Sequence, residues 1–538
     1  MFSDRIVKND NVSITALELY PSDYELVLKQ LVTIYGNRHF AFYWNNGYQC
    51  LAKLNLEQGK LKYVPTSNRI NQNPLTLLQQ KKLLDEKDAL FIFDNLLDFD
   101  YLTPQQRSQR ESQIFNCANR LQYLPKVKLI LLGEWIQLSP KLRLKIEQVR
   151  LSLPTELEIE RFLKTQLKHE PPAKLISACQ GLSWGDIHHE LEQFQQLSTA
   201  EKDDVFDPLE LLTQKLIELK EERLNNSDLN LEYFSKPEIP RIGGNDLLSR
   251  FLFEKLAKLN EPAAQHYGIK PPKAMLFVGP PGTGKSLTAK MTAKSLGYTI
   301  LGISFGDILG SDNPDRIVSR LLELAQSIGK VVLFLDDWDK GLADWESGGA
   351  ARRIVQKFLT WMQEHSSPVI TIGTVNRIEL LPAELVRRFD DGGIWMIDLP
   401  HRGAIYDIFN IYLAKYFPTQ FPYSNPETVE DTPWTIEQWT ELLDEAEECT
   451  PVEIADVVKL CLSDWYCSLS PEERASKEKS SQIEFEYLLL KVKQIIKASV
   501  RASESIQAMR NNAWFAKPAS SPDSSPFKLE EEALLGGG

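Results

Sequence analysis

One short segment limits the fold of this chain more than any other feature. It reads Gly279-Pro280-Pro281-Gly282-Thr283-Gly284-Lys285-Ser286, and it lies between an apolar run at 274–278 and a helix-forming stretch that opens with Leu287. A strand, a glycine-rich loop and a helix in this order form a phosphate-binding loop. The glycines turn successive backbone N–H groups toward one anion, and the helix adds the positive end of its dipole. A simple turn between a strand and a helix is disfavoured, because every fixed position of the motif is filled.

Two acids after a second apolar run extend the predicted site. Residues 331–335 are Val-Val-Leu-Phe-Leu, and Asp336 and Asp337 follow them. Ligands of an open parallel sheet bind at the carboxyl ends of its strands. We therefore expect Asp336 and the Ser286 hydroxyl to hold Mg²⁺, and Lys285 to contact the β- and γ-phosphates of a nucleotide. Asp337 is then positioned to polarise the attacking water.

Polar residues farther along complete the predicted site. The apolar run at 369–375 ends in Asn376, an amide that we expect between the two preceding motifs, where it orients the water or the γ-phosphate. Arg387 and Arg388 are adjacent at the end of a helix-forming stretch. An arginine that reaches a neighbouring subunit's γ-phosphate can raise the rate by a factor on the order of 10^3 or more. Arg388 is our first choice for this role and Arg387 our second, with local ion pairs as the alternative.

Composition bears on the partners and on the compartment. The net charge is −13 and no basic stripe is present, which disfavours a broad contact with a nucleic-acid backbone. None of the six cysteines forms a CxxC pair, so neither a zinc site nor a disulfide framework is indicated. No apolar run approaches the length of a membrane span, and the N-terminus lacks the apolar core of a signal peptide. We expect an intracellular protein without a membrane span.

The first part of the chain echoes the second. Residues 91–94, Phe-Ile-Phe-Asp, resemble Leu-Phe-Leu-Asp at 333–336, and 150–154 resemble 396–400 at a similar spacing. No phosphate-binding loop accompanies the first set. We infer a duplicated nucleotide-binding fold whose first copy has lost its chemistry, with two unrelated α/β domains as the alternative.

These patterns predict an α/β protein in which a parallel sheet of the P-loop NTPase type carries a helical lid and follows a degenerate α/β domain. The tail is rich in Ser and Pro and then acidic, which is typical of disorder. The expected divisions are a leader and helix at 1–36, a front domain at 37–197, a connecting helix and linker at 198–236, an ATPase core at 237–400, a helical lid with a C-terminal helix at 401–515, and a disordered tail at 516–538.

Taken in order, the motifs resemble the AAA clade of the AAA+ ATPases over residues 240–515. The segments 358–364, 367–369 and 499–511 narrow the resemblance to divergent AAA proteins first catalogued as a conserved open reading frame of algal plastids and cyanobacteria. That family also carries a degenerate AAA-like domain in front. The resemblance implies ATP hydrolysis, hexamers and a photosynthetic host, hence a location in the cytoplasm or the plastid stroma. It also implies that the turn at Ile242 and Gly243 lies beside the adenine.

The chain departs from this family at Asp337, where Glu is usual. Asp is shorter by one carbon–carbon bond, about 1.5 Å, and a general base must lie within hydrogen-bond reach of its water. Slow hydrolysis is therefore expected. We keep three functions open. The first is a homo-oligomeric ring, a hexamer, that hydrolyses Mg-ATP at subunit interfaces to remodel or regulate a protein partner, through its front domain. The others are an ATP-gated assembly scaffold with slow or no hydrolysis and, less favoured, a DNA-linked ATPase.

Overall fold

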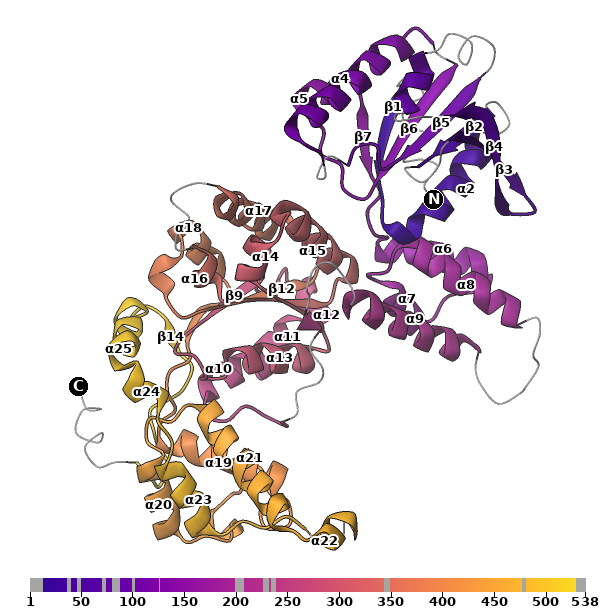
Figure 1. Ribbon diagram of the computed structural model, residues 1–538. Helices are drawn as coiled ribbons and strands as arrows, with labels where there is room; N and C mark the ends of the chain where they lie inside the picture. The colour runs from indigo at the N-terminus through magenta and orange to yellow at the C-terminus, as the bar shows by residue number, and fades with distance from the viewer. Residues whose placement is uncertain are drawn as a thin grey trace. The chain divides into compact units, whose positions relative to one another are not determined.

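The computed structural model of the protein describes residues 13–35, 40–45, 50–69, 74–79, 88–98, 102–124, 126–198, 208–225, 232–233, 239–342, 349–476 and 480–528. The chain divides into two compact units, Met1–Lys220 and Glu221–Gly538. Each unit is an α/β domain with its own sheet (Figure 1).

The front unit is built on a sheet of strand order β4-β3-β2-β5-β6-β1-β7. The hairpin β3–β4 is antiparallel. The neighbouring strands in the series β2-β5-β6-β1-β7 pair in parallel. Its elements are β1 (Ile14–Glu18), η1 (Pro21–Asp23), α2 (Tyr24–Tyr35), β2 (Phe40–Trp44), β3 (Cys50–Glu57), β4 (Lys60–Arg69), η2 (Pro74–Gln79), β5 (Ala89–Asp94), α4 (Pro104–Leu121), β6 (Val127–Gly133), α5 (Pro140–Arg143), β7 (Glu147–Arg150), α6 (Glu156–Leu167), α7 (Ala173–Cys179), α8 (Trp184–Ser198) and α9 (Pro208–Asn225).

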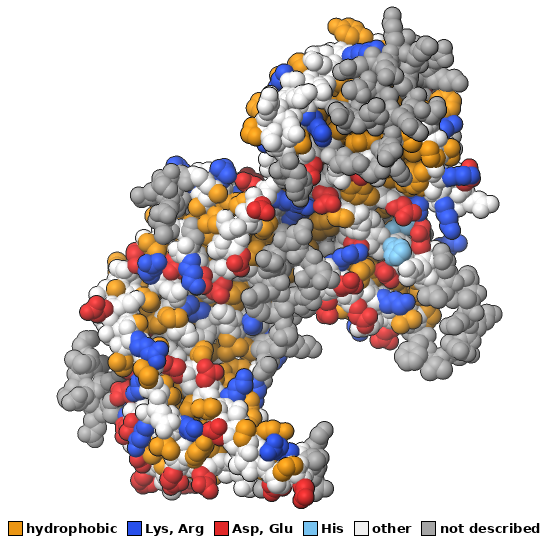
Figure 2. Space-filling model, in the orientation of Figure 1, with side chains coloured by type: hydrophobic (Ala, Val, Ile, Leu, Met, Phe, Trp, Pro, Cys, Tyr) orange, Lys and Arg blue, Asp and Glu red, His pale blue; other side chains and the backbone are white. Residues whose placement is uncertain are grey.

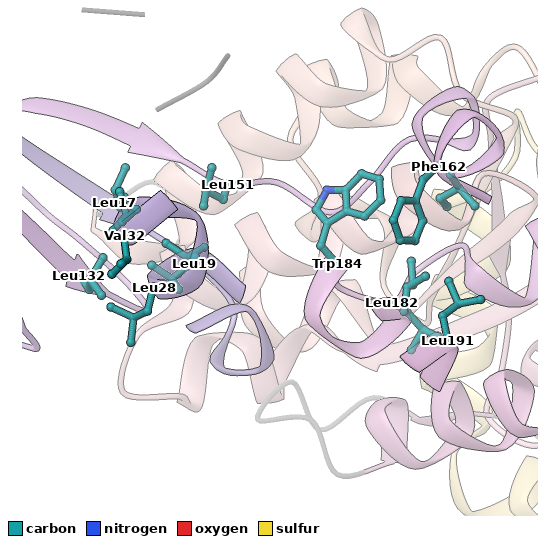
Figure 3. Packing of buried hydrophobic residues seen from close by; sticks show 14 of the residues in the cluster. Leu17, Leu19, Leu28, Val32, Leu132, Leu151, Phe162, Leu182, Trp184 and Leu191 are labelled. Atoms are coloured by element: carbon teal, nitrogen blue, oxygen red, sulfur yellow. The ribbon is translucent and has the colours of Figure 1, made fainter. Parts of the chain in front are cut away.

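Two buried clusters hold this unit together, one on each face of the sheet. On one face, Leu17 and Leu132 of the strands pack with Leu28 of α2, and the same cluster continues into the helices after β7 (Figure 3). There Phe162 and Trp184 meet edge to face with their ring centroids 5.4 Å apart. On the other face, α4 covers the sheet. The strands β5 and β6 in the middle of the sheet are almost wholly buried because helices cover both faces.

The second unit is a sheet of order β14-β13-β9-β12-β11-β10-β8 that carries a helical lid. Helices α10 and α13 cover one face of the sheet together with η3. Its elements are β8 (Glu232–Tyr233), α10 (Asp246–Arg250), η3 (Phe251–Leu256), α11 (Ala257–Leu259), α12 (Pro262–His266), β9 (Ala274–Val278), α13 (Lys285–Leu296), β10 (Thr299–Ser304), α14 (Phe305–Gly310), α15 (Pro314–Ile328), β11 (Val331–Asp336), α16 (Trp338–Leu342), α17 (Ala350–Glu364), β12 (Val369–Val375), η5 (Ile378–Leu380), α18 (Ala383–Val386), η6 (Arg387–Phe389), β13 (Ile394–Met396), α19 (Arg402–Tyr416), η7 (Val429–Asp431), α20 (Ile436–Glu445), α21 (Pro451–Ser468), α22 (Pro471–Ser476), α23 (Phe485–Lys493), α24 (Ala498–Arg501), α25 (Ser503–Asn512) and β14 (Lys517–Pro518).

The parallel parts of the two sheets have the same topology. The front unit runs β2-β5-β6-β1-β7 and the second runs β10-β11-β12-β9-β13, so in each the first strand of the parallel set lies between the fourth and the fifth. The agreement extends to a backbone detail. Asn95 after β5 and Asp337 after β11 both have a left-handed backbone, with φ of 54° and 52°. Non-glycine residues rarely adopt this conformation, so the match supports the inferred duplication.

In the front unit, the place of the phosphate-binding loop is filled by the unit's own residues. The segment between β1 and α2 contains no glycine, and its Asp23 is buried. The Asp23 carboxylate accepts the backbone N–H of Gly185 at 2.6 Å, and the Ser22 hydroxyl lies 2.8 Å from that of Ser183. Burial raises the pKa of Asp23 to about 6. These contacts join the loop to the first turn of α8.

Two predicted boundaries of the front unit are wrong. The expected leader at 1–36 contains β1, which pairs with both β6 and β7 and is therefore a central strand of the sheet. The expected connecting helix at 198–236 contains α9, whose Leu212 and Leu216 are buried in the front core. Strand β1 and the part of α9 up to Lys220 belong to the front unit because long-range packing covers their apolar side chains.

The prediction of a disordered tail from residue 516 is also wrong for residues 517–528. Lys517 and Pro518 form β14, which pairs in parallel with β13. Farther on, Phe527 is buried in the core of the lid. Backbone pairing and one aromatic anchor thus hold a segment whose composition is typical of disorder. Residues 529–538 lie outside the described part of the chain.

Candidate functional site

The loop after β9 has the backbone that a phosphate site requires. Gly279 has a φ of 155°, and a Cβ on it would lie 2.0 Å from the carbonyl oxygen of Ile397, so no other residue fits there. Gly282 has a φ of 85° and packs beneath Thr450 at the start of α21. Helix α13 begins directly after the loop, at Lys285. The backbone N–H groups of the loop and of the first turn can therefore face one anion.

The predicted loop residues differ in exposure. Those that fix the loop to the protein are buried or half-buried, and Thr283 donates to the carbonyl oxygen of Pro280 at 2.9 Å. Pro281 at the tip is exposed. Ser286 and Leu287 are half-buried in the first turn of α13. The Ser286 hydroxyl therefore lies at the rim of the loop, where it can contact an ion beside a bound phosphate.

Lys285 is held at the centre of the site. Its ammonium is buried and donates to the carbonyl oxygens of Gly279 and Pro280, both at 2.8 Å, and to Oδ1 of Asn376 at 3.0 Å. Burial lowers its pKa to about 8, while the charges of Asp336 and Asp337 act in the opposite direction. A bound phosphate would supply the anionic partner that these neutral acceptors do not.

The depressed pKa of Lys285 predicts a pH dependence of ATP affinity. Below pH 8 the ammonium is charged and affinity is at its plateau. As the pH rises through about 8 the free site loses this proton, and binding must take it up again, so the Kd for ATP should rise by up to about tenfold per pH unit. Titrations between pH 7 and 9.5 measure this. Lys285→Arg, which keeps its charge over this range, should give a flat profile, and an equal slope in both proteins would contradict the assignment.

Asn376 lies between the lysine and the acids. Its Oδ1 accepts from Lys285, and its Nδ2 donates to Oδ1 of Asp337 at 3.4 Å. Oδ2 of Asp337 accepts from the ammonium of Lys340. The carboxylate of Asp337 is therefore contacted from two sides, by an amide and by an ammonium group.

Thr374 organises both acids, and sequence reasoning missed it. Its buried hydroxyl donates to the carboxylate of Asp336 and accepts the backbone N–H of Asp337 at 3.1 Å. One hydroxyl thus fixes the acid that we expect to hold Mg²⁺ and the left-handed turn that carries the second acid. The signal was present in the sequence, because Thr374 is one of two threonines in a mostly apolar strand and lies near its carboxyl end.

Replacing Thr374 by valine should weaken the site. The change keeps the shape but leaves a buried N–H and a carboxylate without one partner each, which costs about 1–3 kcal/mol of folding stability, and ATP turnover should fall by about tenfold or more. Thr374→Ser should retain most of both. Thr371 on the same strand is a matched control, because its hydroxyl is buried and has no hydrogen-bond partner among the residues that the structure describes. Chemical denaturation and phosphate release test this, and equal losses in Thr371→Val and Thr374→Val would contradict it.

Asp339 is a second residue that organises the site, and sequence reasoning assigned it no role. It is 2% exposed and accepts the backbone N–H groups of Asn376 at 3.4 Å and Arg377 at 3.2 Å. It therefore fixes the turn that follows β12 and, with it, the direction in which the Asn376 amide leaves the strand.

Asp336 and Ser286 present the ligands that Mg²⁺ prefers. This ion takes oxygen ligands and is commonly bound through one or two carboxylates together with substrate phosphates. A carboxylate oriented by Thr374 and a hydroxyl at the rim of the phosphate-binding loop fit that chemistry. When bound, the ion would neutralise charge on the phosphates.

The two adjacent arginines have different surroundings. Arg387 is exposed and Arg388 is half-buried. The side-chain oxygen of Gln363 on α17, with its amide oriented to satisfy both groups, accepts from Nη1 of Arg388 at 2.9 Å. Arg388, our first choice from the sequence, is thus engaged within its own unit. Arg387 is the more exposed of the two.

The turn expected beside the adenine is docked on the lid. A Cβ on Gly243 would lie 2.8 Å from Ile408 of α19, and the Gly244 N–H donates to Asp407 of the same helix at 3.1 Å. Asp407 also pairs with Arg241. On the phosphate side, the N–H of Val452 in α21 donates to the carbonyl of Gly282 at 3.3 Å. Core and lid thus both border the candidate site.

Comparisons with known proteins agree with this geometry. Residues 275–392 match the family described as ATPase family associated with various cellular activities (AAA). An "uncharacterized AAA domain-containing protein ycf46" of Trieres chinensis is 29% identical over 65% of this chain and 70% of its own length. The protein of the same description from Pyropia yezoensis is 31% identical over 51% of this chain and 56% of its own. A proteasome-activating nucleotidase of Saccharolobus solfataricus is 30% identical over 34% of this chain and 50% of its own.

Proposed function

Because the chain carries an AAA domain and is similar to the ycf46 proteins of algal plastids, we propose that it hydrolyses Mg-ATP at the interfaces of a homo-oligomeric ring, a hexamer, and uses the energy to remodel or regulate a protein partner. The observation that carries this proposal is the continuous chain of contacts from Lys285 through Asn376 to Asp337. It joins the phosphate-binding loop, the strand-end amide and the acid at one edge of the sheet.

The roles of the side chains follow from their positions. Lys285 and the N–H groups of the loop bind the phosphates, and Asp336 with Ser286 holds Mg²⁺. Asp337 accepts a proton from the attacking water, which Asn376 orients. Positive charge from a neighbouring subunit completes the site, and the exposed Arg387 is better placed to supply it than Arg388.

Other features bear on the partner and the location. On the face in view in Figure 2, Lys and Arg side chains are interspersed with Asp and Glu, which disfavours a nucleic-acid partner and the DNA-linked ATPase. A protein partner, contacted through the front unit, is the proposal that remains. Among the described residues, no helix has the length and apolar character of a membrane span. We propose a location in the cytoplasm or the plastid stroma, in line with the plastid-encoded relatives.

A specific observation favours a second candidate function, an ATP-gated assembly scaffold with slow or no hydrolysis. Asp337 is a short acid, and one of its oxygens is engaged by Lys340. An acid that is short and partly engaged by a lysine fits an ATPase that works slowly.

Variants of Asp337 distinguish the two functions. Asp337→Asn should lower phosphate release by about 10^2-fold or more, because the water loses its proton acceptor, while the Kd for ATP stays within about threefold. Asp337→Glu should raise turnover, since the longer side chain reaches farther toward the water. Phosphate release with Mg-ATP measures both, and chelation of Mg²⁺ by EDTA should abolish it. Turnover that is the same in wild type and Asp337→Asn would leave the scaffold as the better description.

A further inference from the structure

Residues 517–528, here called the C-terminal strap, are attached to the core sheet at one end. Strand β14 pairs in parallel with β13 at the edge of the sheet. Next, the N–H of Ala519 donates to the carbonyl of Met396, and the N–H of Leu248 in α10 donates to the carbonyl of Ala519, both at 3.0 Å. Ala519 itself is buried in the core cluster that underlies the sheet. This end of the strap is therefore part of the nucleotide-binding core.

The other end of the strap is attached to the lid. Asp523, which is 5% exposed, accepts the backbone N–H of Gly403 in the first turn of α19 at 3.1 Å. A Cβ on Gly403 would lie 2.7 Å from Ser525, so the strap and the helix are in close contact. Phe527 is buried in the lid core, with its ring centroid 5.0 Å from that of Tyr406. The strap thus ends inside the lid.

The segment between these attachments spans the connection from core to lid. The chain passes from β13 to α19 through residues 397–401. Just before the strap, Arg510 of α25 binds Asp398 in this connection through two hydrogen bonds, of 2.7 and 3.0 Å. The C-terminal part of the chain therefore contacts the core, the connection and the lid in succession.

The strap also contacts both the core and the lid on the side of the site where the adenine base is expected. On the core wall, the N–H of Ser521 donates to Asp246 at 2.7 Å, directly after the turn at Ile242 and Gly243. On the lid wall, Asp523 holds the N-terminus of α19, the helix whose Asp407 binds the N–H of Gly244. A change in the angle between core and lid would have to break one of these two sets of contacts.

We propose that the C-terminal strap is a positioning element of the nucleotide site, which fixes the lid against the core on the base side and thereby slows nucleotide release. The identity of the ligand rests on the proposed function, whereas the fixing of the lid does not. A restraint at the connection acts on the walls of the pocket without contacting the reacting phosphates. Its loss should therefore change the off-rate more than the rate of the chemical step.

Two truncations of the full chain test the proposal. A stop after Lys528 removes only residues beyond the strap and is the control, and a stop after Ala516 removes the strap as well. Stopped-flow release of a fluorescent ATP analogue with Mg²⁺ should be about tenfold or more faster for the shorter chain and unchanged for the control. Single-turnover hydrolysis should differ by less than threefold. Equal release rates in the two truncations would overturn the proposal.

Point variants and a measurement without nucleotide keep the proposal testable in two cases: the shorter chain does not fold, or the wild type binds no nucleotide. If the shorter chain does not fold, Asp523→Ala and Phe527→Ala in the full chain replace it as the test. Nucleotide release should be faster in both variants, and unchanged release would overturn the proposal. If wild type binds no nucleotide, the proposed function fails, and hydrogen exchange of α19 and residues 242–250 without nucleotide decides. Faster exchange in these segments after loss of the strap supports the restraint, and unchanged exchange contradicts it.

Discussion

Lys285→Ala should abolish ATP turnover and lower ATP affinity by about 10^2–10^3-fold, which corresponds to about 3–4 kcal/mol. The loss is large because the ammonium is buried among carbonyl oxygens and one amide, and no other Lys or Arg among the described residues is bonded to the phosphate-binding loop. Isothermal titration with ATP and phosphate release measure the two quantities.

The structure offers a matched control on the same helix. Lys294 lies in the last turn of α13 and is exposed. Lys294→Ala removes the same charge far from the loop and should leave affinity and turnover within about twofold. A similar loss in both variants would assign the effect to net charge rather than to the phosphate contact. Retained affinity in Lys285→Ala would remove the nucleotide site from this loop.

Arg387→Ala should lower turnover by a factor on the order of 10^3 while ATP affinity stays within about threefold. The reason is that an arginine supplied in trans stabilises charge that develops only in the transition state. Arg388→Ala is the internal comparison. Since its guanidinium contacts Gln363 of its own unit, we expect a smaller loss of turnover and some loss of folding stability.

The outcome for the arginine pair is informative in either direction. Turnover and single-site ATP binding should be measured on the same preparations, together with the oligomeric state by light scattering. A large loss in Arg388→Ala with normal turnover in Arg387→Ala would exchange their roles. Normal turnover in the variant that carries both changes would exclude both from the site.

The positions of the glycine-rich loop and of the two acids at a strand end were predictable because the sequence signals for them are local. A glycine-rich turn needs its residues at fixed spacing, and buried strands that end in polar residues are evident as apolar runs. The duplication was likewise visible in the sequence, because the segments that end at Asp94 and at Pro154 resemble segments of the second unit. The shared strand order of the sheets supports it.

The parts that the sequence hid depend on contacts between distant segments. Strand β1 is short and contains Thr15 and Glu18, so its composition does not indicate a central strand, and its place is set by pairing with β6 and β7. The C-terminal strap looks disordered by composition and is held by β13 and by the burial of Phe527. Thr374 was visible as one of two threonines in a mostly apolar strand, but its two partners were not.

The central claim is that each active site is completed by a neighbouring subunit, and mixing two inactive variants tests it most directly. Lys285→Ala retains the arginine but lacks the phosphate contact, and Arg387→Ala retains the phosphate contact but lacks the arginine. Each should be inactive alone. If sites form between subunits, phosphate release should reappear on mixing and rise with protein concentration, because mixed interfaces pair an intact loop with an intact arginine. A mixture that stays inactive, under conditions where wild type assembles and turns over ATP, would contradict the claim.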